Sequence, residues 1–341
     1  MIVFYRLWVV LLVAVVATIW SPTVLEARKV RLRMGTMVPR GSPWHETLLY
    51  IRQEWRRLSD GTVDLIVIAD GQLGDEVEMV RKMRAGVIHA VALSSGGLSR
   101  IDTSILALQV PMMFTSYQEL DYVRDRIAPK LREKIESKGF QYKVLFWTDG
   151  GWVHIFSEEA VRRPIDIKRM RLFTTAGDPE SEKLWRDFGF NVVPLAPTDM
   201  LTSLQSGMVD IVSVPPLLAL FNRIYAEVPY MLDLKLAPLI AGTIISKRAW
   251  DRIPTQYHEP MLTAAREAGT KLRDEIRSLG SQSIKEMKQR GLEVTHLNEA
   301  EVAMWQTFAE STYPKLRGSY CPADFFDEVK RLRDEFRIKS K

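Results

Sequence analysis

Apolar and polar residues follow one another along this chain in two alternating patterns. Residues 30–35 alternate with a period of two, which is typical of a strand, and residues 44–58 carry apolar positions at helical spacing. A Ser-Asp-Gly sequence at 59–61 ends the helical pattern, and residues 63–69 form the next apolar run. The chain after residue 29 is therefore predicted to begin with a strand, a helix and a second strand.

The same alternation continues to the end of the chain, with more helix in the last third. The further strands that the pattern predicts are residues 142–147, 153–156, 170–173, 192–195 and 239–246. The further helices that it predicts are residues 117–138, 180–188, 217–226, 299–313 and 323–339, with residues 258–289 as one long helix. Strands that alternate with helices in this way predict an α/β fold.

One pattern occurs twice, about 120 residues apart. Residues 80–91 and residues 201–212 each combine the end of an amphipathic helix, a glycine and a short apolar run. Gly86 and Gly207 suit the left-handed position that ends a helix, and the apolar run after each is typical of a strand covered on both faces. Ligands of open α/β sheets bind beyond the carboxyl ends of the strands. The two copies of this pattern predict two similar lobes, each of which directs a loop at a shared cleft. The alternative is chance, because a helix followed by a glycine and a strand is common in α/β proteins.

The chain is predicted to cross twice between these lobes. Gly150 and Gly151 stand at the first crossing, where two adjacent glycines can absorb backbone rotation, and Gly242 lies in the apolar run at which the chain returns. We therefore expect a two-lobed α/β fold with a hinge and a long C-terminal helix that spans both lobes. The first lobe is expected to comprise residues 28–149 and about 241–285, and the second residues 150–240 and about 286–341.

The N-terminus has the pattern of a secretory signal. Arg6 precedes a mostly apolar stretch that carries no charge until Glu26, and a small residue stands at Ala27. Cleavage after Ala27 would remove residues 1–27. Leu25 is an imperfect residue for the third position before the cut, so an uncleaved membrane anchor is the alternative.

Composition and charge narrow the classes of function. The 341 residues are 46% hydrophobic and 26% charged, which is ordinary for a globular protein, and the length allows two domains. The net charge of +5 is spread over segments of mixed sign, and no basic run with interleaved aromatics occurs. This distribution argues against a nucleic-acid partner.

No sequence motif points to catalysis or to a metal. The histidines form no His-Glu-x-x-His motif, the acidic residues at 75–78 lack the pattern of a calcium-binding loop, and no Gly-x-Ser-x-Gly motif occurs. Cys321 is the single cysteine, so no internal disulfide is possible and a structural thiol is expected. We therefore expect no enzymatic activity, no cofactor and no metal.

Several short motifs, taken in order, resemble those of one family. They are residues 30–36 with Pro39, Ser42 and His45; Gly71-Gln72-Leu73-Gly74 with Glu76 and Glu78; Gly86-Val87-Ile88; Pro111-Met112-Met113-Phe114; Asp166-Ile167-Lys168; residues 204–210; Glu227 with Tyr230; and Ser246-Lys247-Arg248-Ala249-Trp250. Over nearly the whole mature chain, the sequence resembles the periplasmic solute-binding subunits of TRAP transporters, the DctP-like family. The resemblance implies a periplasmic location and a two-lobed periplasmic binding protein fold. It also implies that the lobes close on a small organic molecule and deliver it to TRAP membrane permease subunits.

The chain departs from this family where the family grips a carboxylate. In the family, an Asp-Leu-Lys-Gly-Leu-Lys-Ile-Arg pattern ends on an arginine that binds the ligand carboxylate. When the pattern is laid on this chain from Asp166, that arginine falls on Phe173. A second family arginine falls within residues 151–154, where His154 is the one residue that can carry charge. If the family pattern were aligned two residues earlier on this chain, the position of the carboxylate-binding arginine would fall on Arg171 instead of Phe173.

This departure predicts a ligand with a large apolar part. A carboxylate in a closed cleft needs a charged partner, usually a bidentate arginine, whereas methionine and aromatic side chains suit apolar ligands. Pro215 offers no N–H donor, and the turn at residues 94–97 is as compatible with a plain turn as with donors to a ligand oxygen. The predicted ligand-binding residues are Trp44, Ser94, Ser95, Met113, Phe114, Trp147, Trp152, His154, Arg171, Phe173 and Pro215, with a place in the core as the alternative for the apolar ones.

Two other functions stay open on the sequence. The same fold would bind an ordinary organic acid if Arg171, or helix N-termini together with His154, held its carboxylate. A ligand-sensing receptor subunit of a membrane sensor, without a transport role, is the alternative from another class.

Overall fold

The computed structural model describes residues 29–137, 139, 141–176 and 179–340. The predicted signal sequence, residues 1–27, lies outside the described residues. Within the described part of the chain, no helix combines the length and the apolar composition that a membrane span requires.

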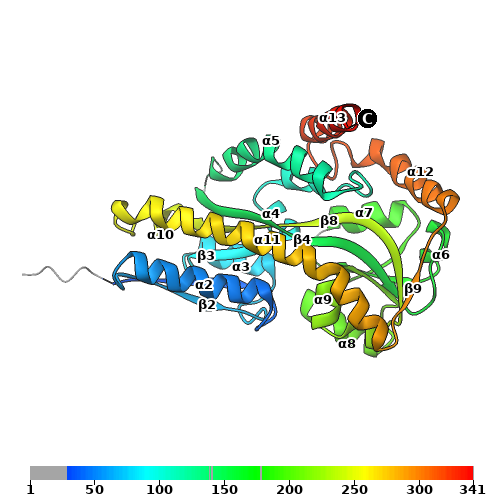
Figure 1. Ribbon diagram of the computed structural model, residues 1–341, viewed down its shortest axis with the longest axis horizontal. Coiled ribbons are helices and arrows are strands. Elements are labelled where there is room, and N and C mark those ends of the chain that lie inside the picture. The colour runs from blue at the N-terminus through cyan, green and yellow to red at the C-terminus, as the bar shows by residue number, and fades with distance from the viewer. Residues whose placement is uncertain (1–28, 138, 140, 177–178, 341) are drawn as a thin grey trace, which may run out of the picture.

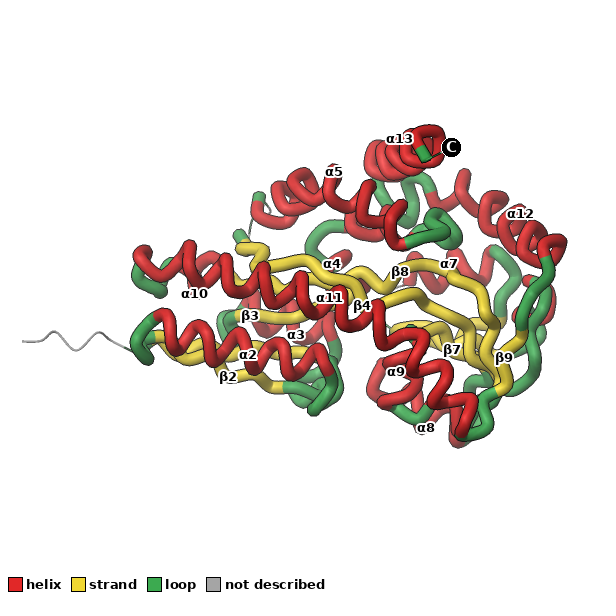
Figure 2. Tube along the Cα trace, in the orientation of Figure 1, coloured by secondary structure: helices red, strands yellow, loops and turns green. Residues whose placement is uncertain are grey.

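The described residues build one sheet of nine strands with helices on its faces and ends (Figures 1 and 2). The strand order is β2-β1-β3-β8-β4-β7-β5-β6, and β9 pairs with β8. The strands are β1 (Val30–Thr36), β2 (Val63–Ile68), β3 (Ala90–Ser94), β4 (Tyr142–Ser157), β5 (Arg171–Thr175), β6 (Asn191–Leu195), β7 (Ile211–Val214), β8 (Tyr230–Ser246) and β9 (Glu293–Thr295).

The helices follow the strands along the chain. The α-helices are α2 (Pro43–Leu58), α3 (Glu76–Arg84), α4 (Ser95–Ser99), α5 (Tyr117–Glu136), α6 (Pro164–Ile167), α7 (Pro179–Asp187), α8 (Met200–Gln205), α9 (Pro216–Phe221), α10 (Lys247–Trp250), α11 (His258–Gln289), α12 (Glu299–Leu316) and α13 (Ala323–Lys339). Short 3-10 helices are η1 (Thr103–Gln109), η2 (Pro197–Asp199), η3 (Ile224–Ala226) and η4 (Thr255–Tyr257). The predicted α/β fold is confirmed.

Two long antiparallel strands, β4 and β8, run through the whole sheet. Their register extends from Tyr142 beside Ser246 to Ser157 beside Tyr230. The parallel strands β1, β2 and β3 flank one half of this pair, and β5, β6 and β7 flank the other. The pattern predicted separate short strands on either side of Gly150. The structure joins them into the single strand β4. The register of β4 against β8 shifts between Asp149 and Trp152, so the strand continues through Gly150 and Gly151.

The repeated pattern forms the same unit in both halves of the sheet. Gly86 ends the segment after α3 with φ of 74°, and Gly207 does so after α8 with φ of 64°. Each glycine leads into a short strand: β3 is parallel to β1 and antiparallel to β8, and β7 is parallel to β5 and antiparallel to β4. The two units therefore take equivalent places next to the long strands.

Helix α11 crosses both halves (yellow to orange in Figure 1). It packs on β4, on α2 of the first half and on α9 of the second. Trp55 of α2 fixes its start by donating from Nε1 to the Met261 carbonyl at 2.9 Å. The predicted long helix over residues 258–289 is confirmed in full. The predicted boundaries of the lobes stay a prediction.

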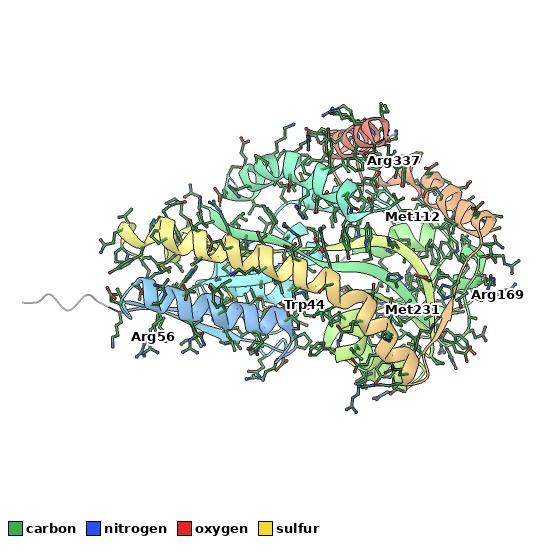
Figure 3. All side chains as sticks on the ribbon, in the orientation of Figure 1. Trp44, Arg56, Met112, Arg169, Met231 and Arg337 are labelled. Carbon is green, nitrogen blue, oxygen red and sulfur yellow. The ribbon has the colours of Figure 1, made fainter. Side chains whose placement is uncertain are left out.

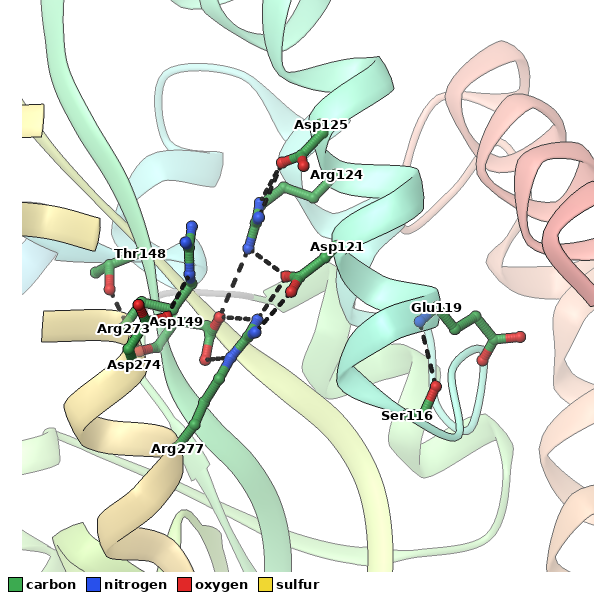
Figure 4. A network of polar contacts seen from close by, with 10 residues as sticks. All are labelled: Ser116, Glu119, Asp121, Arg124, Asp125, Thr148, Asp149, Arg273, Asp274 and Arg277. Carbon is green, nitrogen blue, oxygen red and sulfur yellow. Dashed lines mark hydrogen bonds and ion pairs between the residues drawn. The ribbon is translucent and has the colours of Figure 1, made fainter. Parts of the chain in front are cut away.

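A charged network lies where α5, β4 and α11 meet, beside the middle of the long strands (Figure 4). Arg277 of α11 donates to both carboxylate oxygens of Asp121 on α5, at 2.7 and 2.8 Å, and to Asp149 on β4 at 2.7 Å. Asp149 is 1% exposed. Arg124 adds a contact to Asp121 at 2.6 Å. The network therefore ties the long helix to the strand at the predicted crossing.

Candidate ligand-binding cleft

Two adjoining cavities lie between the two halves of the sheet. The first has a volume of about 290 Å³ and the second about 370 Å³, and both are lined by Gly96 and Thr175. Their walls include the carboxyl ends of β1, β3 and β5, at Thr36, Ser94 and Thr174. This is the position at which open α/β sheets bind ligands, and we call the two cavities together the cleft.

The first cavity is built mainly by the half of the sheet that contains β1 and β3. Trp44 reaches it from the first turn of α2, which Ser42 caps by accepting from the His45 N–H and which begins at Pro43. Figure 3 shows Trp44 near the centre of the molecule, next to α11. Leu218 of α9 closes this cavity from the other half.

The polar wall of the first cavity centres on Glu76 at the start of α3. Its Oε1 accepts from the Ser94 N–H at 2.7 Å, and its Oε2 accepts from Ser94 Oγ at 2.6 Å and from the Gly97 N–H at 2.8 Å. Burial raises the pKa of Glu76, although these hydrogen bonds oppose the shift. Arg100 and Asp75 are the other charged residues on this wall among the described residues.

The second cavity has a largely aromatic and apolar wall. Trp185, Phe190 and Phe308 pack edge to face, with ring centroids 5.5 and 5.9 Å apart. Met112 joins them from a left-handed backbone with φ of 51°, held by its N–H donating to the Leu236 carbonyl at 2.6 Å. Thr174 contributes a buried hydroxyl that has no hydrogen-bond partner among the described residues.

The two halves meet at the rim of the cleft. Gly71, after β2, has φ of 65°, and a Cβ placed on it would lie 3.4 Å from Cγ2 of Thr198 in η2. The two loops that bear these residues come from opposite halves of the sheet. The structure therefore shows a closed arrangement in which both halves enclose the cleft.

Three of the eleven predicted ligand-binding residues line the cleft. Trp44 and Ser94 line the first cavity, and Phe173 lines the second. Phe173 is 8% exposed and also packs against Phe156 and Val212 in the core. Their contact with a ligand stays a prediction.

Five apolar residues of the predicted set lie away from both cavity walls. Met113 and Phe114 are fully buried in the core, because the left-handed Met112 turns its own side chain to the cavity instead. Trp152 packs on Tyr117, with ring centroids 5.2 Å apart. Its neighbour Val153 points to the opposite side of β4 and lines the second cavity. Trp147 packs against Gly242, and Pro215 begins α9.

The three remaining predicted residues are polar, and each has a partner within the protein. Ser95 Oγ donates to Oε1 of Gln109. His154 is buried with Nδ1 3.2 Å from the Leu232 carbonyl oxygen, and burial lowers the pKa of its imidazole, which keeps the ring neutral at pH 7. Arg171 is exposed at the start of β5 and donates from Nε to Asp210 at 2.9 Å.

The sequence reasoning missed Glu76 as a cleft residue and also missed the aromatic wall from α7 and α12. Glu76 belongs to one of the motifs shared with the family, but nothing in its local sequence distinguishes it from the acidic residues beside it. The aromatic residues share no motif, and only the packing of α7 against α12 brings them together. Cys321 is buried, and burial raises the pKa of its thiol to about 12, which suits the expected structural role.

Known proteins resemble this chain over most of its length. A protein of Escherichia coli named 2,3-diketo-L-gulonate-binding periplasmic protein YiaO is 25% identical over 239 residues, which are 69% of this chain and 71% of that protein. A TRAP periplasmic solute-binding protein of Ralstonia eutropha, solved with (S)-2-acetolactate, has a TM-score of 0.83 at 19% identity and covers 90% of this chain and 99% of its own. The sugar-acid-binding protein DctPAm of Advenella mimigardefordensis, solved with galactonate, has a TM-score of 0.83 at 17% identity, with 91% and 99% covered.

The family assignment rests on the match to a family model rather than on these identities. The model described as bacterial extracellular solute-binding protein, family 7, matches residues 34–318. That range contains β2 to β9, the end of β1 and both glycine repeats. It also contains the described residues that line the cleft, apart from Tyr320. The chain belongs to bacterial extracellular solute-binding protein family 7, the DctP family of TRAP periplasmic solute-binding subunits.

Proposed function

We propose that this protein is the periplasmic subunit of a TRAP transporter and captures a small organic molecule with a large apolar part. The observation that carries the proposal is the wall of the second cavity, where Phe173 takes the place of the arginine that the family pattern puts on this strand. Met112, Trp185 and Phe190 continue that wall. Burial of about 200 Å² of apolar ligand surface on such a wall would contribute roughly 5 kcal/mol.

The related proteins point to a second candidate, an ordinary organic acid as the ligand. Acetolactate, galactonate and diketogulonate, the ligands in their names, are small polar acids. Of the cations that the sequence suggested for a carboxylate, Arg171 already pairs with Asp210 outside the cleft and burial keeps His154 neutral. Arg100 lines the first cavity, but it shares that wall with Asp75 and Glu76. The apolar ligand is therefore the better supported of the two.

The proposed cycle needs no chemistry on the ligand. The ligand would contact both halves of the sheet only when they are closed, so that it shifts the balance between open and closed forms. We expect the permease subunits to recognise the closed form, and the signal sequence at residues 1–27 to direct the chain to the periplasm.

Native mass spectrometry tests the proposal directly. The mature chain is secreted, purified without denaturation and weighed, and whatever is bound is then extracted with solvent and identified. An apolar or aromatic adduct is the expected result. A small hydrophilic acid would overturn the apolar ligand while leaving the family intact, and would make Arg171 and His154 the next residues to substitute.

A further inference from the structure

Glu76 fills the position at which a ligand anion would find its hydrogen-bond donors. Where β3 passes into α4, the Ser94 N–H, the Ser94 hydroxyl and the Gly97 N–H all donate to its carboxylate, at 2.6 to 2.8 Å. Backbone N–H groups at such a turn are the usual partners of a bound anion. The chain thus supplies its own carboxylate to these donors.

The backbone around Glu76 is shaped to hold this carboxylate. A Cβ placed on Gly97 would lie 2.8 Å from Glu76 Oε2, so a larger residue would displace the carboxylate. The neighbouring Gly96 N–H donates to Ser94 Oγ at 3.2 Å, which orients the hydroxyl toward Glu76. Glu76, Ser94, Gly96 and Gly97 all line the first cavity. The position of the negative charge is therefore set before any ligand binds.

The two carboxylate oxygens of Glu76 are not equally occupied. Oε2 accepts two hydrogen bonds, whereas Oε1 accepts one, from the Ser94 N–H, among the described residues. Each carboxylate oxygen offers two lone pairs. One acceptor position on Oε1 therefore remains for a donor from the cavity.

The charges on the cleft walls also disfavour an anion. The charged residues among the described lining of the first cavity are two acids, Asp75 and Glu76, and one cation, Arg100. Among the described residues that line the second cavity, the charged one is Glu182, whose carboxylate is 2.9 Å from Nη2 of Arg186 on the same helix. A ligand carboxylate in the first cavity would find these donors already bound to Glu76.

We propose that the cleft binds the polar end of its ligand through a hydroxyl or ammonium group that donates a hydrogen bond to Oε1 of Glu76, so that this end carries no carboxylate. The inference rests on the proposed function, because it names the polar group of the same ligand whose apolar part lies in the second cavity. Gly96 and Thr175 line both cavities, which places the two ends in one continuous cleft.

The test compares three probes that differ only in their polar group. The mature chain, freed of bound ligand, is loaded with the neutral fluorescent reporter N-phenyl-1-naphthylamine, which is then displaced by 1-decanol, decylammonium or decanoate. We expect the alcohol or the ammonium to bind at least about tenfold more tightly than decanoate. Equal affinity of the alcohol and the ammonium would indicate a hydroxyl ligand, and tighter binding of the ammonium a charged one.

Two substitutions connect this selectivity to Glu76. Glu76→Gln keeps the shape of the side chain and should remove the preference over decanoate. Glu78→Gln removes a charge on the same helix that pairs with Arg81 and lines neither cavity, so it should leave the preference in place. The probe comparison on the unmodified chain does not depend on either variant being folded.

Two results would overturn the inference in distinguishable ways. Decanoate that binds as tightly as decanol, or a preference that survives in Glu76→Gln, would remove the donor-bearing ligand while leaving the apolar cleft in place. Failure of all three probes to displace the reporter would instead remove the apolar ligand of the proposed function, and the inference with it.

Discussion

The proposal of an apolar ligand depends on Phe173 more than on any other single residue of the cleft. This residue stands on β5 where the family pattern has an arginine, and its ring is shared between the second cavity and the core beneath. Among the described residues that line the second cavity, the one carboxylate available to a guanidinium in this place is that of Glu182, which already contacts Arg186. Phe173 thus makes this part of the cavity wall apolar and also joins the wall to the hydrophobic core.

Phe173→Arg should weaken binding of the native ligand by at least about tenfold, or roughly 1.4 kcal/mol, because it puts an unpaired charge on an apolar wall. Isothermal titration with the ligand extracted from the purified protein measures the change. Phe173→Leu serves as the control, since it stays apolar and should retain most of the affinity. Unchanged affinity in Phe173→Arg would show that this side chain does not contact the ligand.

His154 gives the protein a stability that depends on pH. Burial lowers the pKa of its imidazole below the ordinary value of about 6.5, with Asp233 opposing the shift and Lys235 adding to it. Because the folded state resists protonation, this contribution to stability is complete above pH 6.5 and is lost as the pH falls through the folded-state pKa. Urea unfolding at pH 7.5 and 5 should show a smaller loss on acidification in His154→Gln than in the wild type. An equal loss in both would mean that His154 does not take part.

Helix α11 packs against β4 through a glycine. Gly269 lies under Phe146, and a Cβ placed on it would lie 2.3 Å from the ring. Gly280, in the same helix, has nothing within 4 Å of such a Cβ. The helix therefore needs glycine at one position and merely tolerates it at the other.

Alanine substitutions separate these two glycines. Gly269→Ala should lower the free energy of unfolding by about 1–3 kcal/mol, because Phe146 or the helix must move. Gly280→Ala should raise it by up to about 1 kcal/mol, since alanine is the better helix former. Chemical denaturation of both variants measures the difference. A gain in stability for Gly269→Ala would contradict the close packing of α11 on β4.

The charged network of Figure 4 joins the long helix α11 to α5 and to the middle of β4. Removal of Arg277 would leave the buried Asp149 with Arg124, 3.9 Å away, as the cation that remains in contact. Breaking a buried ion pair from one side commonly costs about 3–5 kcal/mol, because a charge is left without compensation.

Arg277→Met should therefore lower the free energy of unfolding by about 3 kcal/mol, and Asp149→Asn in the same chain should restore part of it. Arg317→Met is the matched control, because its pair with Asp327 is about half exposed and should be worth at most about 1 kcal/mol. Urea unfolding of the three variants tests the comparison. Similar losses for Arg277→Met and Arg317→Met would show that the network adds nothing beyond a surface pair.

Local patterns predicted the longer helices and the family, but not β9 or the full length of β4 and β8. Helical spacing without a break set α11 at residues 258–289, and the repeated helix-glycine-strand pattern placed Gly86 and Gly207 at equivalent points of the two halves. The periods of 2 and 3.6 residues are properties of neighbouring residues, so a linear sequence carries them. The motifs that mark the family, apart from the start of the first at residues 30–33, lie within the matched range and are local for the same reason.

The local patterns could not predict which segments far apart in the sequence contact one another. Whether an apolar residue faces the core or the cleft depends on which strand or helix packs over it, so Met112 reached the cavity while Met113 and Phe114 went to the core. Glu76 became a wall of the cleft only because β3 and α4 bring Ser94 and Gly97 to it from about twenty residues away. The chain alone thus predicts an α/β solute-binding protein, and the family pattern laid on it from Asp166 puts Phe173 in place of the usual arginine. The packing of its two halves decides which side chains a ligand meets, because that choice is made by partners far apart in the sequence.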